Sequence, residues 1–411
     1  MNKNKHKAPS ASSNSNSMMM TAIETRKRAR RAWTNGRWAL VAVIVGTLVA
    51  CASGPAVEPG GGEPPAGSAD MAPLPPAIVR NASRWTPVRW ASLPGWGRDA
   101  LHEAWNAWVR GCERPAAGQA RLCAQARPLA IASAAEQKAW IEHQFQPYRV
   151  DTPDGGATNG LLTGYYEPIL SATRLPDARH RTPLHAPPPG LRNGQVWYSR
   201  QEIETLPAAQ AALQGRAIAW LADPIDAMVL QIQGSGRLNI TEPNGGQRQV
   251  RLAFAGHNGH TYRSAGRWLL DQGAIRDASW EGIRAWDASH PARLNEMLWS
   301  NPRTVFFREE ALTGFDAQFG PRGAQGVPLT PGRSIAVDPK SIPYGTPVWL
   351  ATQGPALNTQ RLVMAQDTGG AIVGAVRADL FTGWGGWNDP AYLQAASLKQ
   401  PLQLWVLWPR E

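Results

Sequence analysis

Apolar residues recur at helical spacing in three stretches of the chain. Residues 99–112 place five of them on one face, with polar residues elsewhere: Leu101, Trp105, Trp108, Val109 and Cys112. This spacing predicts an amphipathic helix. Residues 133–136 (SAAE) form a capping box, so a second helix should start there and end before Pro147. A third helix is expected over residues 262–272, because Gly273 is suited to ending it.

Most other apolar runs are short and bounded by Gly, Pro or Asn, which is the pattern of β-strands. Strands are predicted at residues 227–233, 249–255, 334–337, 346–351, 361–366 and 402–408. In the last of these, apolar side chains occupy both faces, so we expect this strand to be covered on both sides. The chain is therefore predicted to be mainly β, arranged as a barrel or sandwich, with a few helices.

The excess positive charge lies mostly in the first fifty residues. The whole chain has 42 Lys and Arg residues against 31 Asp and Glu residues, a net charge of +11. Residues 1–50 contain nine of the basic residues and one of the acidic ones, which leaves 33 and 30 in the rest. Proteins that bind nucleic acid concentrate Lys and Arg on one surface. No such basic stripe follows residue 50, so nucleic acid is not expected as a partner.

The start of the chain has the pattern of an export signal. A basic cluster at residues 26–31 (RKRARR) precedes an apolar stretch at residues 38–50. A membrane-spanning helix needs about 20 apolar residues, and this stretch is shorter. The tetrad LVAC, which ends at Cys51, resembles the lipobox of bacterial lipoproteins. Residues 1–50 are therefore predicted to be a signal peptide, with Cys51 lipidated. Ala52, rather than Asp, predicts anchoring to the periplasmic face of the outer membrane.

Residues 51–77 are rich in Pro and Gly and predict a tether between the lipid and a folded body. Beyond Cys51, the sequence contains two further cysteines, Cys112 and Cys123. In an exported protein such a pair is expected to form a disulfide. Closing so short a loop would stabilise the fold by about 2–3 kcal/mol. The alternative is two buried free thiols.

Three aspartates near the end of the chain are candidates for chemistry. Asp338, Asp367 and Asp379 each follow an apolar run and precede Gly, Pro or a turn. This pattern predicts three carboxylates at one rim of a barrel, although a single such aspartate usually forms a turn or caps a helix. Between the last two, residues 369–374 (GGAIVG) predict a hairpin that a ligand backbone can approach closely.

Other polar and aromatic residues have structural interpretations. His257 and His260 are three residues apart, with no cysteine or carboxylate at metal-ligand spacing, so a structural role is expected. We predict neither a metal nor a cofactor. Most of the 19 Trp residues, such as those in the helical stretches at residues 105, 108 and 140, should lie in the core. Trp384 and Trp387 follow Asp379 and are candidates for contact with a sugar.

Five motifs in a fixed order resemble those of the lytic murein transglycosylase A (MltA) family. They lie at residues 160–168 (GLLTGYYEP), 231–236 (QIQGSG), 255–263 (AGHNGHTYR), 326–333 (GVPLTPGR) and 366–372 (QDTGGAI). The resemblance extends from about residue 85 to residue 408. Its last part resembles the three-aspartate domain that this family shares with a wider superfamily.

The resemblance implies a fold and a site. The fold would be a double-psi β-barrel formed by residues 78–171 and 306–411, with a smaller β domain, residues 172–305, inserted into it. The catalytic aspartate of the family corresponds to Asp379, and its neighbour corresponds to Asp367. A peptidoglycan glycan strand would bind in the groove between the domains. Its contacts would be Thr163, Tyr165, Tyr166, Gln231, Gln233, Gly234, Ser235 and Gly236. Cell-wall synthesis proteins are implied as further partners.

The activity implied is cleavage of the bond between MurNAc and GlcNAc, with formation of a 1,6-anhydro sugar. One carboxylate suffices, because the C6 hydroxyl replaces water as the nucleophile. Asp379 must start protonated near neutral pH, which requires desolvation or a nearby like charge, and Asp367 is the candidate for that charge.

Two alternatives remain at this point. A hydrolytic muramidase would need a second carboxylate, which Asp367 or Asp338 would supply. A non-catalytic wall-binding protein of the expansin type would use a related barrel.

Overall fold

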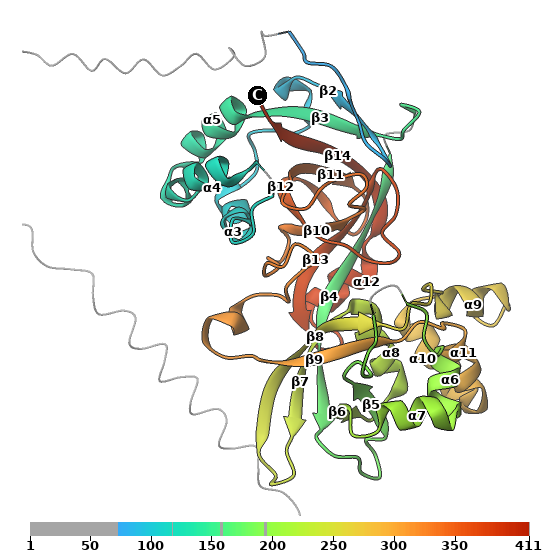
Figure 1. The fold of residues 1–411 in the computed structure, drawn as a ribbon. Helices are drawn as coiled ribbons and strands as arrows, with labels where there is room; N and C mark the ends of the chain where they lie inside the picture. The colour runs from blue at the N-terminus through green and yellow to red at the C-terminus, as the bar shows by residue number, and fades with distance from the viewer. Residues whose placement is uncertain (1–72, 117, 157–158, 193–194, 411) are drawn as a thin grey trace, which may run out of the picture. The chain divides into compact units, whose positions relative to one another are not determined.

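The computed structural model describes residues 73–410 except 117, 157–158 and 193–194. The predicted signal peptide, Cys51 and nearly all of the predicted tether lie outside the described residues. The described chain is mainly β, as predicted, and Figure 1 shows its elements in order. None of the helices in these ranges has the length and apolar character needed to cross a membrane.

The strands are β1 (Ile78–Val79), β2 (Arg84–Pro87), β3 (Phe145–Asp151), β4 (Gly160–Thr173), β5 (Thr182–His185), β6 (Ala217–Leu221), β7 (Gly236–Thr241), β8 (Gln247–His257), β9 (Val305–Ala311), β10 (Ser334–Val337), β11 (Pro347–Gln353), β12 (Asn358–Asp367), β13 (Arg377–Gly385) and β14 (Lys399–Pro409). The α-helices are α3 (Leu101–Gly111), α4 (Ala120–Ala126), α5 (Ala134–Gln144), α6 (Arg200–Thr205), α7 (Pro207–Leu213), α8 (Pro224–Gln233), α9 (Ala265–Asp271), α10 (Trp280–Ser289), α11 (Leu294–Trp299) and α12 (Pro390–Ser397).

Six strands form a closed ring. Their order is β4, β13, β10, β12, β11 and β14, and the pairing of β14 with β4 closes it. Two of the pairings, β13 with β4 and β10 with β12, are parallel, and the rest are antiparallel. Inside the ring lies an apolar core that includes Leu162, Ile335 and Val363. The ring therefore joins the first part of β4 to strands from the C-terminal end of the chain in one barrel.

The long strand β4 belongs to two sheets. Its first part pairs with β13 in the barrel, and residues 169–173 pair with β7 in a second sheet that also contains β5, β6, β8 and β9. The domain boundary predicted after residue 171 falls inside β4. The boundary predicted after residue 305 falls at the start of β9, which pairs with β8. Besides four strands, the segment 172–305 contains the helices α6 to α11.

Helices α3, α4 and α5 lie together beside the barrel strands (Figure 1). Trp105 and Trp108 of α3 are buried there against Trp349 and Trp405 of the barrel, as expected of core tryptophans. A disulfide joins Cys112, at the end of α3, to α4 at Cys123. This bond ties α4 to α3, which packs on the barrel.

Most predicted elements are confirmed within a few residues. The predicted capping box is present at Ser133, whose side chain accepts a hydrogen bond from the backbone of Glu136. The third predicted helix starts later than expected, as α9, because Ser264 caps it. Strand β14 has Leu404 packed into one core and Trp405 into another, so it is covered on both faces.

One prediction was wrong: residues 227–233 form a helix and not a strand. Helix α8 starts at Pro224 after Asp223, whose side chain accepts from the backbone N–H of Ile225. It ends at Gly234, which has a φ of 81° and so takes the left-handed conformation that glycine favours. Both faces of α8 are buried, in two separate clusters. Because apolar residues occupy more than one face, the single apolar stripe that marks a surface helix is absent.

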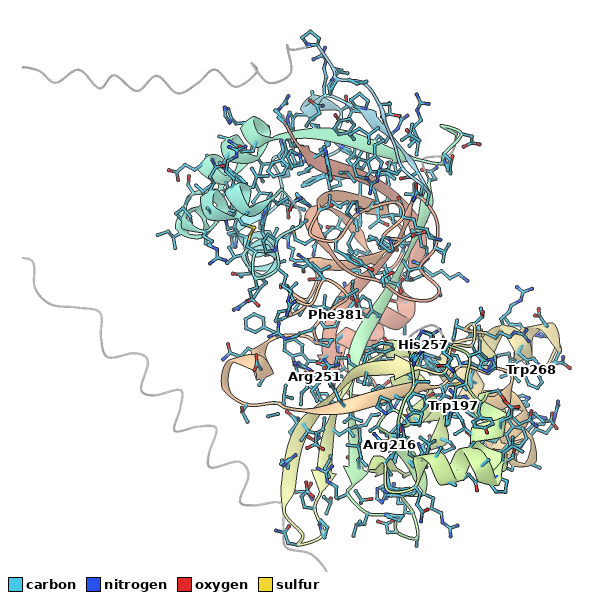
Figure 2. All side chains as sticks on the ribbon, in the orientation of Figure 1. Trp197, Arg216, Arg251, His257, Trp268 and Phe381 are labelled. Carbon is cyan, nitrogen blue, oxygen red and sulfur yellow. A yellow bond between two sulfur atoms is a disulfide. The ribbon has the colours of Figure 1, made fainter. Side chains whose placement is uncertain are left out.

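A buried ion triad joins β4, β7 and β8. Glu167 on β4 is fully buried and accepts hydrogen bonds from Arg237 at 2.8 Å and from Arg251 at 2.6 Å (Arg251 is labelled in Figure 2). Both arginines also donate to the carbonyl of Phe319. The guanidinium of Arg237 lies 4.0 Å from the ring centroid of Trp384 on β13. The triad therefore connects three strands and the loop before β10.

Candidate active site

A cavity of about 740 Å³ is lined by residues from several distant parts of the chain. It contains the two aspartates of the predicted pair, Asp367 and Asp379, together with Tyr165. Its wall also includes the turn after α8, at Gly234 and Ser235, and the glycine-rich residues 369–372. A volume of this size suits a ligand of several rings rather than a single small ion.

Strand β10 brings the two aspartates together. Its residue Ala336 pairs with Asp367 on β12 and with Asp379 on β13. Residues paired in this way across adjacent strands point to the same face of the sheet. Because neighbouring strands are about 4.8 Å apart, the two backbones are separated by about 10 Å. Aspartate side chains directed into the cavity can cover part of that distance.

Asp379 is held by one arginine. Its Oδ1 accepts a hydrogen bond of 2.9 Å from Nη1 of Arg377, and Nη2 of Arg377 donates to Thr163 on β4. Among the described residues, none donates to its other oxygen, Oδ2. The side chain keeps 18% of its surface exposed. Burial raises the pKa of Asp379, although the ion pair with Arg377 opposes that rise.

Asp367 is held by a tyrosine and a backbone amide. The hydroxyl of Tyr165 donates to Oδ2 at 2.9 Å, and the N–H of Ala324 donates to Oδ1 at 2.9 Å. Burial, with a smaller contribution from the charge of Asp379, raises the pKa of Asp367 to about 6 against these hydrogen bonds. Burial also raises the pKa of Tyr165, so its hydroxyl remains a donor. Tyr165 itself packs on Phe381, whose position Figure 2 marks.

The structure favours one of the two causes considered for the raised pKa of Asp379. These causes were desolvation and repulsion by the charge of Asp367. For Asp379, the cause that raises the pKa is burial. Mutual repulsion is instead visible at Asp367, where it follows burial and the opposing hydrogen bonds in size. Both carboxyl groups are therefore biased toward the protonated form.

The predicted substrate-binding residues divide into two groups. Five line the cavity: Tyr165, Gln231, Gln233, Gly234 and Ser235. Thr163, Tyr166 and Gly236 do not. The hydroxyl of Thr163 accepts a hydrogen bond from Arg377, and Tyr166 is buried against Tyr392. The side chain of Gln233 accepts from the backbone N–H of Tyr166, which holds the end of α8 against β4.

Trp384 and Trp387, the candidates for contact with a sugar, do not line this cavity. The ring of Trp384 packs under Arg237, and Trp387 donates to Asp226. Asp338 lies outside the cavity as well. It accepts from the backbone N–H groups of Lys340 and Gly374 and so braces a turn.

Sequence reasoning missed two residues at this site. His257 was expected to be structural, and its Nδ1 does accept from the backbone of Gly259, yet it also lines the cavity. Arg303 lines the cavity as well, and no motif in the sequence marks it. Outside the cavity, the buried Glu167 was missed too, although a charged residue in an apolar strand is a signal that it needs a buried partner. In the described parts of the chain, no group of three or more His, Cys, Asp or Glu side chains could hold a metal.

Comparison with known proteins gives matches over both parts of the fold. The family model described as "MltA specific insert domain" matches residues 161–308, and the one described as "3D domain" matches residues 333–408. The chain is 33% identical over 240 residues to membrane-bound lytic murein transglycosylase A of Escherichia coli K12. That match covers 55% of this chain and 60% of the relative's length.

Two solved structures are similar over most of the chain. One is the lytic transglycosylase LtgG of Burkholderia pseudomallei, which is 41% identical with a TM-score of 0.53. The similarity covers 83% of this chain and 99% of LtgG. The other is MltA from Neisseria gonorrhoeae, which is 29% identical with a TM-score of 0.66. It covers 82% of this chain and 96% of the gonococcal one.

Proposed function

Because this chain belongs to the MltA family of lytic transglycosylases, we propose that it cleaves peptidoglycan glycan strands by lytic transglycosylation, with Asp379 as acid and base. The observation that supports this proposal is the cavity in which Asp367 and Asp379 meet the turn after α8. The barrel with two parallel pairings supports its assignment as a double-psi barrel, with residues 172–305 as the inserted domain.

The environment of Asp379 suits an acid that later becomes a base. Arg377 occupies Oδ1, so the proton of the neutral acid resides on Oδ2, the oxygen without a described partner. Oδ2 gives this proton to the bridging oxygen as the bond from C1 of MurNAc breaks. The charge left on Asp379 is then stabilised by Arg377 at 2.9 Å.

The second half of the reaction returns the proton. The C6 hydroxyl of MurNAc attacks C1, and Oδ2 takes the hydroxyl proton as the new C–O bond forms. The sugar closes to a 1,6-anhydro ring, the leaving GlcNAc keeps the first proton, and Asp379 is again neutral. No water is consumed, so no second carboxylate is needed to activate water or to attack C1. Burial biases Asp379 toward the protonated form with which the reaction starts, and Asp367 lies beside it in the same cavity.

The product of the reaction tests this proposal. Purified glycan strands digested by the full protein should end in anhydro-MurNAc, lighter by one water than a hydrolysed end. Mass spectrometry of the fragments distinguishes the two ends directly. Free reducing MurNAc as the main product would assign the protein as a muramidase. Intact strands, bound but not cut, would assign it as a wall-binding protein.

We propose in addition that the mature protein is a lipoprotein of the outer membrane, anchored at Cys51 and facing the periplasm. The lipobox-like LVAC and the name of the E. coli relative, which is membrane-bound, support this. Cys51→Ala should abolish labelling of the protein by fatty acid in cells, whereas Ser53→Ala should keep the label. Unchanged labelling of Cys51→Ala would contradict lipid attachment at this residue.

A further inference from the structure

The cavity wall carries more positive than negative charge. Its acidic residues are the two aspartates of the proposed catalytic pair, whereas four arginines line it: Arg114, Arg303, Arg308 and Arg322. Two of these are close to an acid outside the cavity. Arg308 pairs with Glu310 at 2.7 Å, and Arg322 lies 3.8 Å from Glu113. Arg114 is exposed to solvent.

Arg303 differs from the other three because it is partly buried without an acidic partner among the described residues. Its Nη1 donates to the carbonyl of His260 at 3.1 Å, and no carboxylate of the described chain lies within ion-pair distance. Burial alone lowers the pKa of Arg303, with no carboxylate to oppose the shift. An unpaired cation that is partly removed from water is costly to the fold. A bound anion would offset that cost.

The backbone around Arg303 is held on both sides. Its N–H donates to Asn301 at 3.2 Å, and its carbonyl accepts from the buried Arg200 at 2.8 Å. The guanidinium of Arg303 also lies close to Gly370, because a Cβ atom added to this glycine would be 3.9 Å from the central carbon of the guanidinium. The cation is therefore fixed beside the loop that follows Asp367, in the same cavity as Asp379.

We propose that Arg303 binds a free carboxylate of the peptidoglycan strand, carried by the lactyl group of a muramic acid or by its peptide stem. This inference rests on the proposed function. A strand built of GlcNAc alone is neutral and would leave Arg303 unpaired. A strand containing MurNAc carries carboxylates, and the fork of a guanidinium can bind one with two parallel hydrogen bonds. Arg303 would thus help the cavity to select muramic acid strands over neutral glycans.

Binding to three ligands tests the proposal, with each protein carrying Asp379→Asn so that the ligand is not consumed. The ligands are glycan oligomers that bear peptide stems, the same oligomers after an amidase has removed the stems, and chitohexaose. Stem removal frees the lactyl carboxylate, and chitohexaose has no carboxylate. Arg303→Gln should weaken binding of a carboxylate-bearing ligand by about tenfold, the typical worth of a charge-assisted hydrogen bond, and should leave chitohexaose unaffected.

The ligand that is weakened identifies the source of the carboxylate. A loss confined to the stem-bearing oligomer assigns a stem carboxylate, and a loss confined to the stripped oligomer assigns the lactyl group. Arg303→Lys, which keeps the charge, should recover part of the affinity. Arg267→Gln is the control, because Arg267 is 74% exposed on α9 and paired with Asp271. Equal weakening of all three ligands would assign Arg303 a structural role and overturn the proposal, as would no change in any of them. Failure of the protein with Asp379 intact to form anhydro ends would instead contradict the proposed function.

Discussion

Asp379→Asn is expected to reduce turnover by about 10² to 10⁴-fold while leaving the protein folded. The amide can neither protonate the bridging oxygen nor accept the proton of the C6 hydroxyl, so both halves of the reaction fail. The fold should survive because asparagine has the same shape and its amide oxygen can still accept from Arg377. Release of anhydro-MurNAc from glycan strands measures turnover, and circular dichroism checks the fold. Activity near that of the wild type would contradict the assignment of Asp379.

Asp367→Asn is the matched control, because it makes the same isosteric change at the neighbouring buried carboxyl group. The variant should keep more activity than Asp379→Asn. Burial, rather than the charge of Asp367, raises the pKa of Asp379. Removing the neighbouring carboxylate should therefore leave the alkaline limb of the pH–rate profile in place. A shift of that limb toward acid would show that the charge of Asp367 helps to keep Asp379 protonated.

Glu167→Gln is expected to lower the free energy of unfolding by about 3–5 kcal/mol, the usual cost of removing one partner from a buried ion pair. The substitution leaves Arg237 and Arg251 charged, with 4% and 6% of their side chains exposed. The carbonyl of Phe319 remains their acceptor but cannot neutralise two charges. Denaturant unfolding followed by tryptophan fluorescence and by circular dichroism measures the change.

Glu296→Gln is the control for this loss of stability. Glu296 also pairs with an arginine, Arg293, but the two side chains are 53% and 42% exposed. Exposed pairs of this kind contribute at most about 1 kcal/mol. A similar small effect in Glu167→Gln would mean that water or rearrangement satisfies the two arginines, and the triad would not be important for stability.

Local chemistry was enough to predict many elements of this protein. The capping box at Ser133 acts through residues three apart, so it needs no tertiary contact to be recognised. Strand β10 was predicted with the bounds that the structure has, because a short apolar run between turn residues is the usual pattern of a β-strand. The same reasoning failed for α8, whose apolar residues are buried in two separate clusters and give this helix the composition of a strand. There the signals of Asp223, Pro224 and Gly234 were the better guide.

The site depended on contacts between distant residues. The chain order places Asp367 and Asp379 twelve residues apart, but only the pairing of both with Ala336 puts them on one face of the barrel. Trp384 and Trp387 are closer to Asp379 along the chain than Asp367 is, yet their packing places both outside the cavity. Arg303 lies just before β9 and lines the cavity, although no motif in the sequence marks it. Sequence determines local conformation through neighbours, whereas strand register and burial, which set these contacts and pKa values, arise only when the whole chain is folded.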